Sequence, residues 1–393
     1  MSTRPRLSDL SILNYCYIIM FILWKYIQPF DKNEVIPVLF SFLILFLNIY
    51  HDVGLIKIRP FSTHFLWLLY VVIMSAFLGM APGLLPYFYL SQLFSIIVAS
   101  VIAYKEFMRD SRTLLRVLTW IMIIYVAIGW GTREVNDSGR MHYEGGNGFP
   151  NKMVPFAFIV LLRWARKEIN VPIAIFLLAV MIYVAVSCAT RKAFTGISLI
   201  FVAFIVSYLD FRSARSLGVI VALVMAFFGV RYMMGNTLLG ERFERESYTG
   251  KSLVKQETIF SDMLGDRTDQ YIMGWWEFQK RPLFGMGLTN FRRETGYHAV
   301  LHTEYIVQLT ECGLVGFMLF MAYFFNLLKR SLNVVRRYDR HVGFVLGGYV
   351  GAILFMCFTA WIYNSDMMFV CFGVVAGVSD DYIRRARMAQ IAR

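Results

Sequence analysis

Charged residues are scarce in this sequence. Of its 393 residues, 17% are charged, whereas about a quarter are charged in a typical soluble domain. Hydrophobic residues make up 58%, more apolar surface than a soluble chain of this size can bury. Apolar runs near the ~20 residues that cross a hydrocarbon core recur from one end to the other. The composition excludes an ordinary soluble domain and predicts that the lipid bilayer is the main solvent.

Cysteine is also sparse, and no soluble basic module is visible. The five cysteines are scattered through apolar stretches without CxxC spacing, which excludes a disulfide framework and a cysteine-based metal site. The net charge of +13 would suit nucleic acid, but the cations lie mainly in short segments between apolar runs, as membrane topology requires. No basic face with interleaved aromatics occurs, so we expect no nucleic-acid partner.

The apolar runs predict an all-α polytopic integral membrane protein of about twelve transmembrane helices. We expect a single membrane domain over residues 1–393. The predicted helices lie near residues 10–29, 35–50, 63–80, 84–104, 113–130, 153–166, 170–188, 193–209, 216–234, 304–328, 342–363 and 366–382.

Lysine and arginine in the short loops predict the orientation. With a cytoplasmic N-terminus, 22 of them fall inside and only 6 in the short outside loops, so the positive-inside rule places both termini in the cytoplasm. Two polar segments then lie outside the membrane, a short loop at 131–152 and a long loop at 235–303. Loops this long are usually functional or disordered. In the long loop, Trp275 and Trp276 favour an interfacial helix.

Three features on the outer side are candidates for chemistry. Arg191 and Lys192 interrupt two apolar helices, where a charge costs about 2.5–3.5 kcal/mol unless it faces a partner or water. They favour either a hairpin tip with snorkelling side chains or an anion site. Arg267 opens a predicted helix in the long loop, and alone it would be a solvated surface arginine.

The third feature is a histidine pair at the start of the tenth predicted helix. His298 and His302 are four residues apart and would share one helical face, which is compatible with a metal site. The spacing is not HExxH and no third ligand is evident, so we expect no metal. The alternative for His302 is an interfacial histidine without a special role. Gly285 to Gly287 predict a turn, because a dinucleotide-binding fingerprint needs a third glycine and a preceding strand.

Four segments resemble the O-antigen ligase and polymerase superfamily of bacterial envelope glycan assembly, in the same order. They are GNGFPNKMVPFAFIVLL, SCATRKAFTGISLI, GDRTDQYIMGWWEFQKRPLFGMGLTNF and LHTEYIVQLTECGLVGFMLF. The resemblance implies a polytopic, lipid-donor (GT-C type) glycosyltransferase of the bacterial inner membrane with its active site on the periplasmic face. It implies a glycan donor on undecaprenyl pyrophosphate and an acceptor that is another lipid-linked repeat unit or the lipid A core.

The resemblance also implies roles for individual residues. Arg191 matches the membrane-edge arginine of the family, Arg267 its loop arginine and His302 its essential histidine. Lys192 departs from the pattern, because a small residue is more usual there. Arg140, Lys152, His298 and Lys192 are further candidates for substrate binding, since they fall on the same side of the membrane.

The chemistry of the reaction agrees with these roles. A glycosyl diphosphate needs its departing pyrophosphate neutralised, which arginine does with paired hydrogen bonds. A sugar hydroxyl gains from a positioned base, and histidine titrates near neutral pH. No DxD pair is present to hold a divalent ion for a nucleotide-sugar donor. We therefore expect a metal-independent, inverting transfer without a cofactor.

The sequence leaves three functions open. A polymerase is favoured by FPNKMVPF, an asparagine-containing segment typical of polymerases, and a ligase that transfers the glycan to the lipid A core shares the same fold. A transporter or flippase of glycolipid is the distant alternative, but it should place ionisable or helix-breaking residues near the midplane, often in two matching halves. Other polysaccharide-assembly proteins are candidate partners.

Overall fold

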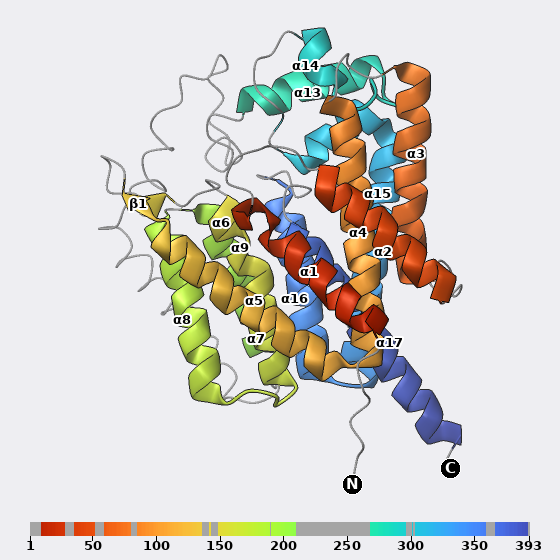
Figure 1. The fold of residues 1–393 in the computed structure, drawn as a ribbon. Helices are drawn as coiled ribbons and strands as arrows, with labels where there is room; N and C mark the ends of the chain where they lie inside the picture. The colour runs from red at the N-terminus through yellow and green to blue at the C-terminus, as the bar shows by residue number, and fades with distance from the viewer. Residues whose placement is uncertain are drawn as a thin grey trace.

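The computed structural model describes residues 9–27, 35–51, 59–79, 85–135, 141–142, 148–188, 190–209, 268–295, 301, 303–358 and 366–391. Long apolar helices account for most of these residues, as the hydrophobic runs predict (Figure 1). The elements of the first third of the chain are α1 (Asp9–Ile27), α2 (Val35–His51), the 3-10 turn η2 (Arg59–Phe61), α3 (Ser62–Leu78), α4 (Leu85–Arg109) and α5 (Ser111–Gly131).

The middle of the chain contains two very short strands and four helices. The strands pair in antiparallel register, with Glu134 opposite His142. The elements are β1 (Glu134–Val135), β2 (Met141–His142), α6 (Gly148–Asn151), α7 (Met153–Ala165), α8 (Val171–Ser187) and α9 (Arg191–Val206). The last part of the chain forms α13 (Thr268–Lys280), α14 (Asn290–Thr295), α15 (Glu304–Arg337), α16 (Arg340–Met356) and α17 (Asp366–Ile391).

Eleven of the twelve predicted apolar runs fall wholly or mostly on described residues, and the described part of each contains a helix. The run at 216–234 lies outside the described residues. Three described helices are long and apolar enough to cross a membrane by length and composition, at Tyr89–Arg109, Ser111–Gly131 and Glu304–Arg337. Shorter apolar helices accompany them at Leu10–Leu23, Ile36–His51, Ser62–Leu78, Val171–Ser187 and Arg340–Met356. The composition therefore agrees with a membrane protein.

Some predicted helix ends differ from the observed ones. α15 continues to Arg337 and α17 to Ile391, whereas the apolar runs stop at 328 and 382. Charged residues end an apolar run, but lysine, arginine and glutamate are good helix formers. A helix can therefore continue beyond the apolar run with the same backbone conformation. α16 ends earlier than predicted, at Met356, because the chain turns at Cys357, whose carbonyl accepts the Glu304 N–H at 2.9 Å.

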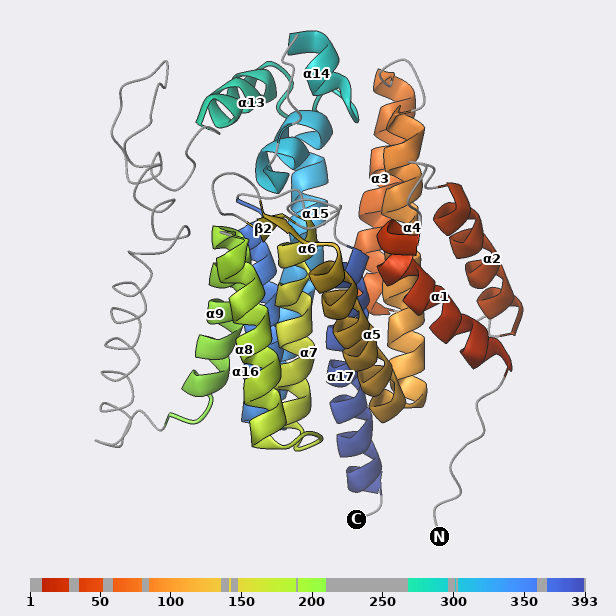
Figure 2. The same cartoon turned by 60° about the vertical axis from the view of Figure 1, so that its left-hand side comes forward.

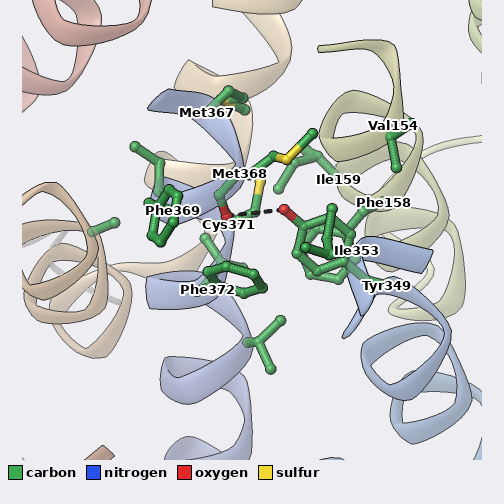
Figure 3. Close-up of a cluster of buried hydrophobic side chains, with 14 of the residues drawn as sticks. Val154, Phe158, Ile159, Tyr349, Ile353, Met367, Met368, Phe369, Cys371 and Phe372 are labelled. Carbon is green, nitrogen blue, oxygen red and sulfur yellow. Dashed lines mark hydrogen bonds between the residues drawn. The ribbon is translucent and has the colours of Figure 1, made fainter. Parts of the chain in front are cut away.

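The core lies where α7, α16 and α17 meet (Figure 3). Phe158 of α7 stacks on Tyr349 of α16 with ring centroids 4.3 Å apart, and the Tyr349 hydroxyl donates to the Met368 carbonyl at 2.9 Å. α17 also packs closely on α4, where Ser100 Oγ donates to the Phe369 carbonyl at 2.8 Å. Small residues allow this approach, since a Cβ on Gly373 would overlap the Ser100 backbone. α7 is thus surrounded by protein on all sides.

The bundle has two distinct ends (Figures 1 and 2). One end carries α13, α14, α6, the short strands and the start of α9, and we call it the loop end. At the other end, the start of α1 meets the end of α4, since Ser11 Oγ donates to the Glu106 carboxylate at 3.0 Å. The same end holds part of α17, because the Tyr104 hydroxyl donates to Asp380 at 2.9 Å. We call it the ion-pair end.

Candidate functional site

The structure describes three of the seven candidate residues. Lys152, Arg191 and Lys192 lie at the loop end of the bundle, as the sequence predicts for residues on one side of the membrane. Arg140, Arg267, His298 and His302 lie outside the described residues. For these four residues we describe only the neighbouring elements of the chain.

Arg191 and Lys192 are the first two residues of α9. α8 ends at Ser187, and only a short turn separates the two helices. The helix cap is Thr190, whose hydroxyl donates back to the Cys188 carbonyl at 3.3 Å and does not cap the first turn of α9. Both cationic side chains are half-buried.

Two cations in a first helical turn are the reverse of the usual arrangement. The N-terminus of a helix already has a partial positive charge, so each added cation is unfavourable by roughly 0.3–1 kcal/mol. The first turn of α9 contains no acidic residue to offset them. Backbone N–H groups, the helix dipole and two side-chain charges therefore lie at the same helix end, and together they favour an anion there.

Lys152 lies in a more enclosed position. It is 2% exposed, its Nζ donates to the Ile22 carbonyl at 3.3 Å, and it lies 4.9 Å from the centroid of the Tyr125 ring. These contacts tie α1, α5 and the start of α7 together. The substrate contact of Lys152 stays a prediction, beside this structural role.

Helix α6, which precedes Lys152, carries a buried polar atom at the loop end. α6 packs against both α8 and α9. Its last residue, Asn151, has a buried side-chain oxygen that accepts no hydrogen bond from the described residues. A buried amide oxygen normally has a donor, so this atom is suited to a ligand hydroxyl.

The described part of the long loop is fixed to a kink in α15. Gly313 interrupts the helix with φ 67° and ψ −173°, a conformation essentially restricted to glycine. Residues 281–289, which we call the docked segment, supply the missing hydrogen bonds. Leu314 N–H donates to the Pro282 carbonyl at 2.8 Å, and Met286 N–H donates to the Thr310 carbonyl at 3.0 Å. The predicted turn at Gly285 to Gly287 is part of this contact, with φ 72° and 87° at the two glycines.

Side chains strengthen the attachment of the docked segment. The Glu311 carboxylate accepts hydrogen bonds from the backbone N–H groups of Thr289 and Phe291. Asn290 Nδ2 donates to the Met286 carbonyl at 2.8 Å and to the Gly79 carbonyl, beyond α3, at 2.7 Å. The segment therefore joins α14 to both α3 and α15.

α13 lies across the loop end and packs on the first turns of α15 (Figure 2). Thr310 Oγ1 donates to the Gly274 carbonyl at 3.1 Å. Trp275 and Trp276 are 46% and 60% exposed on this helix. The predicted helix is confirmed, and contact of its indoles with lipid headgroups stays a prediction. Glu277 of the same helix pairs with Lys280 at 2.6 Å, as a simple charge partner would.

Both chain neighbours of His302 are firmly held. Leu301 is buried in an apolar cluster with Ile306 and Phe291. Thr303 is fully buried, caps α15, and has a hydroxyl without a partner among the described residues. Next in the chain, Glu304 donates its N–H to Cys357. Leu301 and Thr303 are therefore both held at the loop end.

Sequence reasoning missed a buried polar chain next to this point. The Glu304 side chain accepts from Gln308 Nε2 at 2.9 Å, and Trp67 Nε1 donates to Gln308 Oε1 at 3.0 Å. Glu304 and Gln308 are four residues apart on one face of α15, a spacing that was visible in the sequence. The partner Trp67 was not, because it comes from α3, far away in the chain.

Residues 173–321 match the family described as O-antigen ligase. The chain carries a domain of the O-antigen ligase and polymerase superfamily. No curated protein matches the chain. The superfamily domain covers α8, α9, α13, α14 and the start of α15, so it contains Arg191, Lys192, Arg267, His298 and His302. Arg140 and Lys152 precede it.

The match over residues 173–321 supports an activity in general terms. It supports an O-antigen ligase-like or polymerase-like activity, that of a membrane glycosyltransferase acting on lipid-linked glycans. Together with the apolar helices, the match supports a bacterial inner-membrane protein of polysaccharide biosynthesis.

Proposed function

We propose that this protein is a polysaccharide polymerase. It transfers a glycan from undecaprenyl pyrophosphate to a sugar hydroxyl of another lipid-linked repeat unit. The observation that carries the proposal is the pair of half-buried cations, Arg191 and Lys192, at an uncapped helix N-terminus within the superfamily domain. That arrangement suits a diphosphate better than it suits a neutral sugar.

The cations act on the leaving group. Cleavage of the bond between sugar and diphosphate leaves negative charge on the departing oxygen, and Arg191 with Arg267 neutralises it. Arginine offers two parallel N–H donors to phosphate oxygens, which fixes the diphosphate as well as its charge. Lys192 adds a third positive charge at the same helix end.

His302 acts on the acceptor. It takes the proton from the attacking sugar hydroxyl as the new glycosidic bond forms, and attack opposite the diphosphate inverts the anomeric centre. The buried neighbours Leu301 and Thr303 support this role, because a base must be held accurately. The transfer requires no divalent ion, since arginine supplies the charge that a metal would supply.

The proposed membrane topology is the one that lysine and arginine in the short loops predict. The chain crosses the membrane about twelve times, both termini are cytoplasmic, and the loop end faces the periplasm. The start of α1 and the end of α17 lie at the ion-pair end, away from α13 and α14, which supports this orientation.

The ligase is the second candidate function, because it would use the same donor clamp and base. The segment FPNKMVPF favours the polymerase, and in the structure it forms the end of α6 and the start of α7, beside α8 and α9. A flippase finds less support, because the three described candidates, Lys152, Arg191 and Lys192, lie at one end of the bundle.

The test is a transfer assay with purified full-length protein in detergent and an undecaprenyl-pyrophosphate-linked repeat unit as the only substrate, with EDTA present. We expect a ladder of polymer on a gel. Single transfer that appears only after lipid A core is added would establish the ligase instead. No transfer to any acceptor, with movement of the lipid-linked glycan across liposomes, would overturn the enzyme. Loss of the ladder in EDTA alone would refute the metal-independent step.

Variants assign the roles. His302→Ala should reduce the rate by about 10²–10⁴-fold while the protein stays folded, and retained wild-type polymer would remove His302 from the mechanism. Arg191→Gln should cost about 10²–10³-fold, as removal of a charge-stabilising donor does. The matched control is Arg293→Gln, an exposed arginine of α14 whose loss should leave the rate unchanged.

A further inference from the structure

The ion-pair end contains a basic groove between the last turns of α15 and α17. Two adjoining cavities of about 710 and 680 Å³ form it, and both are lined by Asn333, Ile383 and Arg387. The groove lies at the opposite end of the bundle from α13 and α14 (Figure 1). It therefore has no part in the site proposed for glycan transfer.

Positive charge in the groove exceeds negative charge. Lys329, Arg337 and Arg387 line it, and none of them makes an ion pair with a described residue. Among the described residues, Asp380 is the one carboxylate in the lining. It is already neutralised by Arg330 at 2.5 Å. Arg387 lines both cavities, whereas Lys329 lines only the larger one and Arg337 only the smaller one, so each cavity has two cations without an ion-pair partner among the described residues.

The depth of the groove matches the headgroup layer. Residues 314–337 of α15, after the kink, extend about 36 Å, whereas a hydrocarbon core is about 30 Å thick. The last turns therefore extend past the apolar layer if the span begins at the kink. Exposed apolar side chains accompany the cations, since Met388 is 56% exposed in the groove lining and Ile391 is 85% exposed at the end of α17.

Membrane topology alone does not require that these cations line one groove. The positive-inside rule needs cations near the helix ends, but it does not need them to converge on a cavity. Arg336 and Arg112 show the difference, because both are exposed at the same end and neither lines the groove. A cavity with grouped cations and an apolar edge is typical of an anionic lipid headgroup site.

We propose that this groove binds the phosphate of an anionic phospholipid. The phosphate lies between Arg337 and Arg387, with Lys329 in the adjoining cavity, and an acyl chain runs along α17 beside Met388. Free phosphate shares the charge chemistry but gains nothing from the apolar edge. The bound lipid joins the ends of α15 and α17, which meet the rest of the bundle mainly through side chains at this end.

The test measures lipid binding to the full-length protein in neutral detergent by native mass spectrometry. The ligands are phosphatidylglycerol and phosphatidylcholine, and inorganic phosphate is the competitor. The groove variant is Arg337→Gln with Arg387→Gln. The control is Arg112→Gln with Arg336→Gln, which removes the same charge from the same end outside the groove. A second groove variant, Arg337→Lys with Arg387→Lys, keeps the charge.

We expect the wild type to bind phosphatidylglycerol at least about tenfold more tightly than phosphatidylcholine. The groove variant should lose about 30-fold in affinity for phosphatidylglycerol, because it removes two arginine–phosphate contacts and each such contact strengthens binding about fivefold. The control and lysine variants should lose less than about threefold. Equal losses in groove and control variants would overturn the proposal, as would equal binding of the two lipids. Displacement of the lipid by millimolar phosphate would reject a lipid as the ligand in favour of free phosphate.

Discussion

The two ends of the bundle are held together by different kinds of bond. At the loop end, main-chain groups of the docked segment complete the broken hydrogen bonding of α15 around Gly313. At the ion-pair end, side chains make the connections, as in the pairing of Arg330 with Asp380 and the cluster of Glu106 with Ser11 and Asn14.

This difference has a physical meaning. Main-chain contacts through glycines are short and rigid, do not titrate, and fix an element to within a fraction of an ångström. Side-chain contacts depend on charge, pH and salt and tolerate small movements. The end that carries the proposed chemistry thus has the stiffer attachment, and the opposite end has the adjustable one.

The largest expected effect comes from Gly313→Ala. A Cβ there would overlap the Leu283 carbonyl, and the backbone conformation would be strained as well. We expect a loss of about 3 kcal/mol or more and at least about a hundredfold loss of transfer, measured by thermal melting and the ladder assay. Gly351→Ala in α16 is the control, because open space surrounds that position. Equal melting temperatures and transfer rates of the two variants would show that the contact between Gly313 and the docked segment is unimportant.

A smaller effect is expected from Arg330→Ala at the other end. The side chains of Arg330 and Asp380 are 17% and 24% exposed, so their separation should cost about 1–2 kcal/mol, less than for a fully buried pair. Melting should fall by a few degrees while transfer by the folded protein is unchanged. Arg293→Ala, at an exposed pair, should stay within about 0.5 kcal/mol. If Arg330→Ala reduced transfer as much as Gly313→Ala does, the proposed difference between the two ends would be wrong.

The smallest effect concerns Asp110, which caps α5 at the ion-pair end. Its carboxylate accepts from the N–H groups of Arg112 and Thr113, both at 3.1 Å, and its removal should cost about 1 kcal/mol. Partial burial acts to raise the pKa of Asp110, but the hydrogen bonds from Thr113 and Arg112 and the charge of Arg116 outweigh it and lower this pKa.

The sign of the pH dependence follows from that lowered pKa. The stabilisation by Asp110 is present above the ordinary aspartate pKa of about 3.9 and is lost as the pH falls through the lower folded-state value. Melting of the wild type should therefore decline more steeply below about pH 4 than melting of Asp110→Asn. Parallel curves for the two proteins would contradict the assignment.

The sequence predicted the helices well, because membrane crossing leaves an apolar run that can be read directly. The position of Arg191 and Lys192 between two apolar helices and the helix after Arg267 were also predicted from local pattern, although α9 begins at Arg191, two residues earlier than expected. The kink at Gly313 and its partner segment were not. Their contacts join backbone atoms about thirty residues apart, and no side-chain periodicity records them. Trp67, which reaches Gln308 from α3, escaped prediction for the same reason.

The docked segment also has a consequence for how the protein is made. Residues 281–289 precede α15 in the chain, so they leave the ribosome before the helix that needs them. A kinked helix with unpaired carbonyl and N–H groups would be costly in lipid. Synthesis in this order supplies the partner first. In the proposed topology the segment must also cross the membrane before α15 takes its bent shape, so translocation of the loop becomes a step in the assembly of the helix itself.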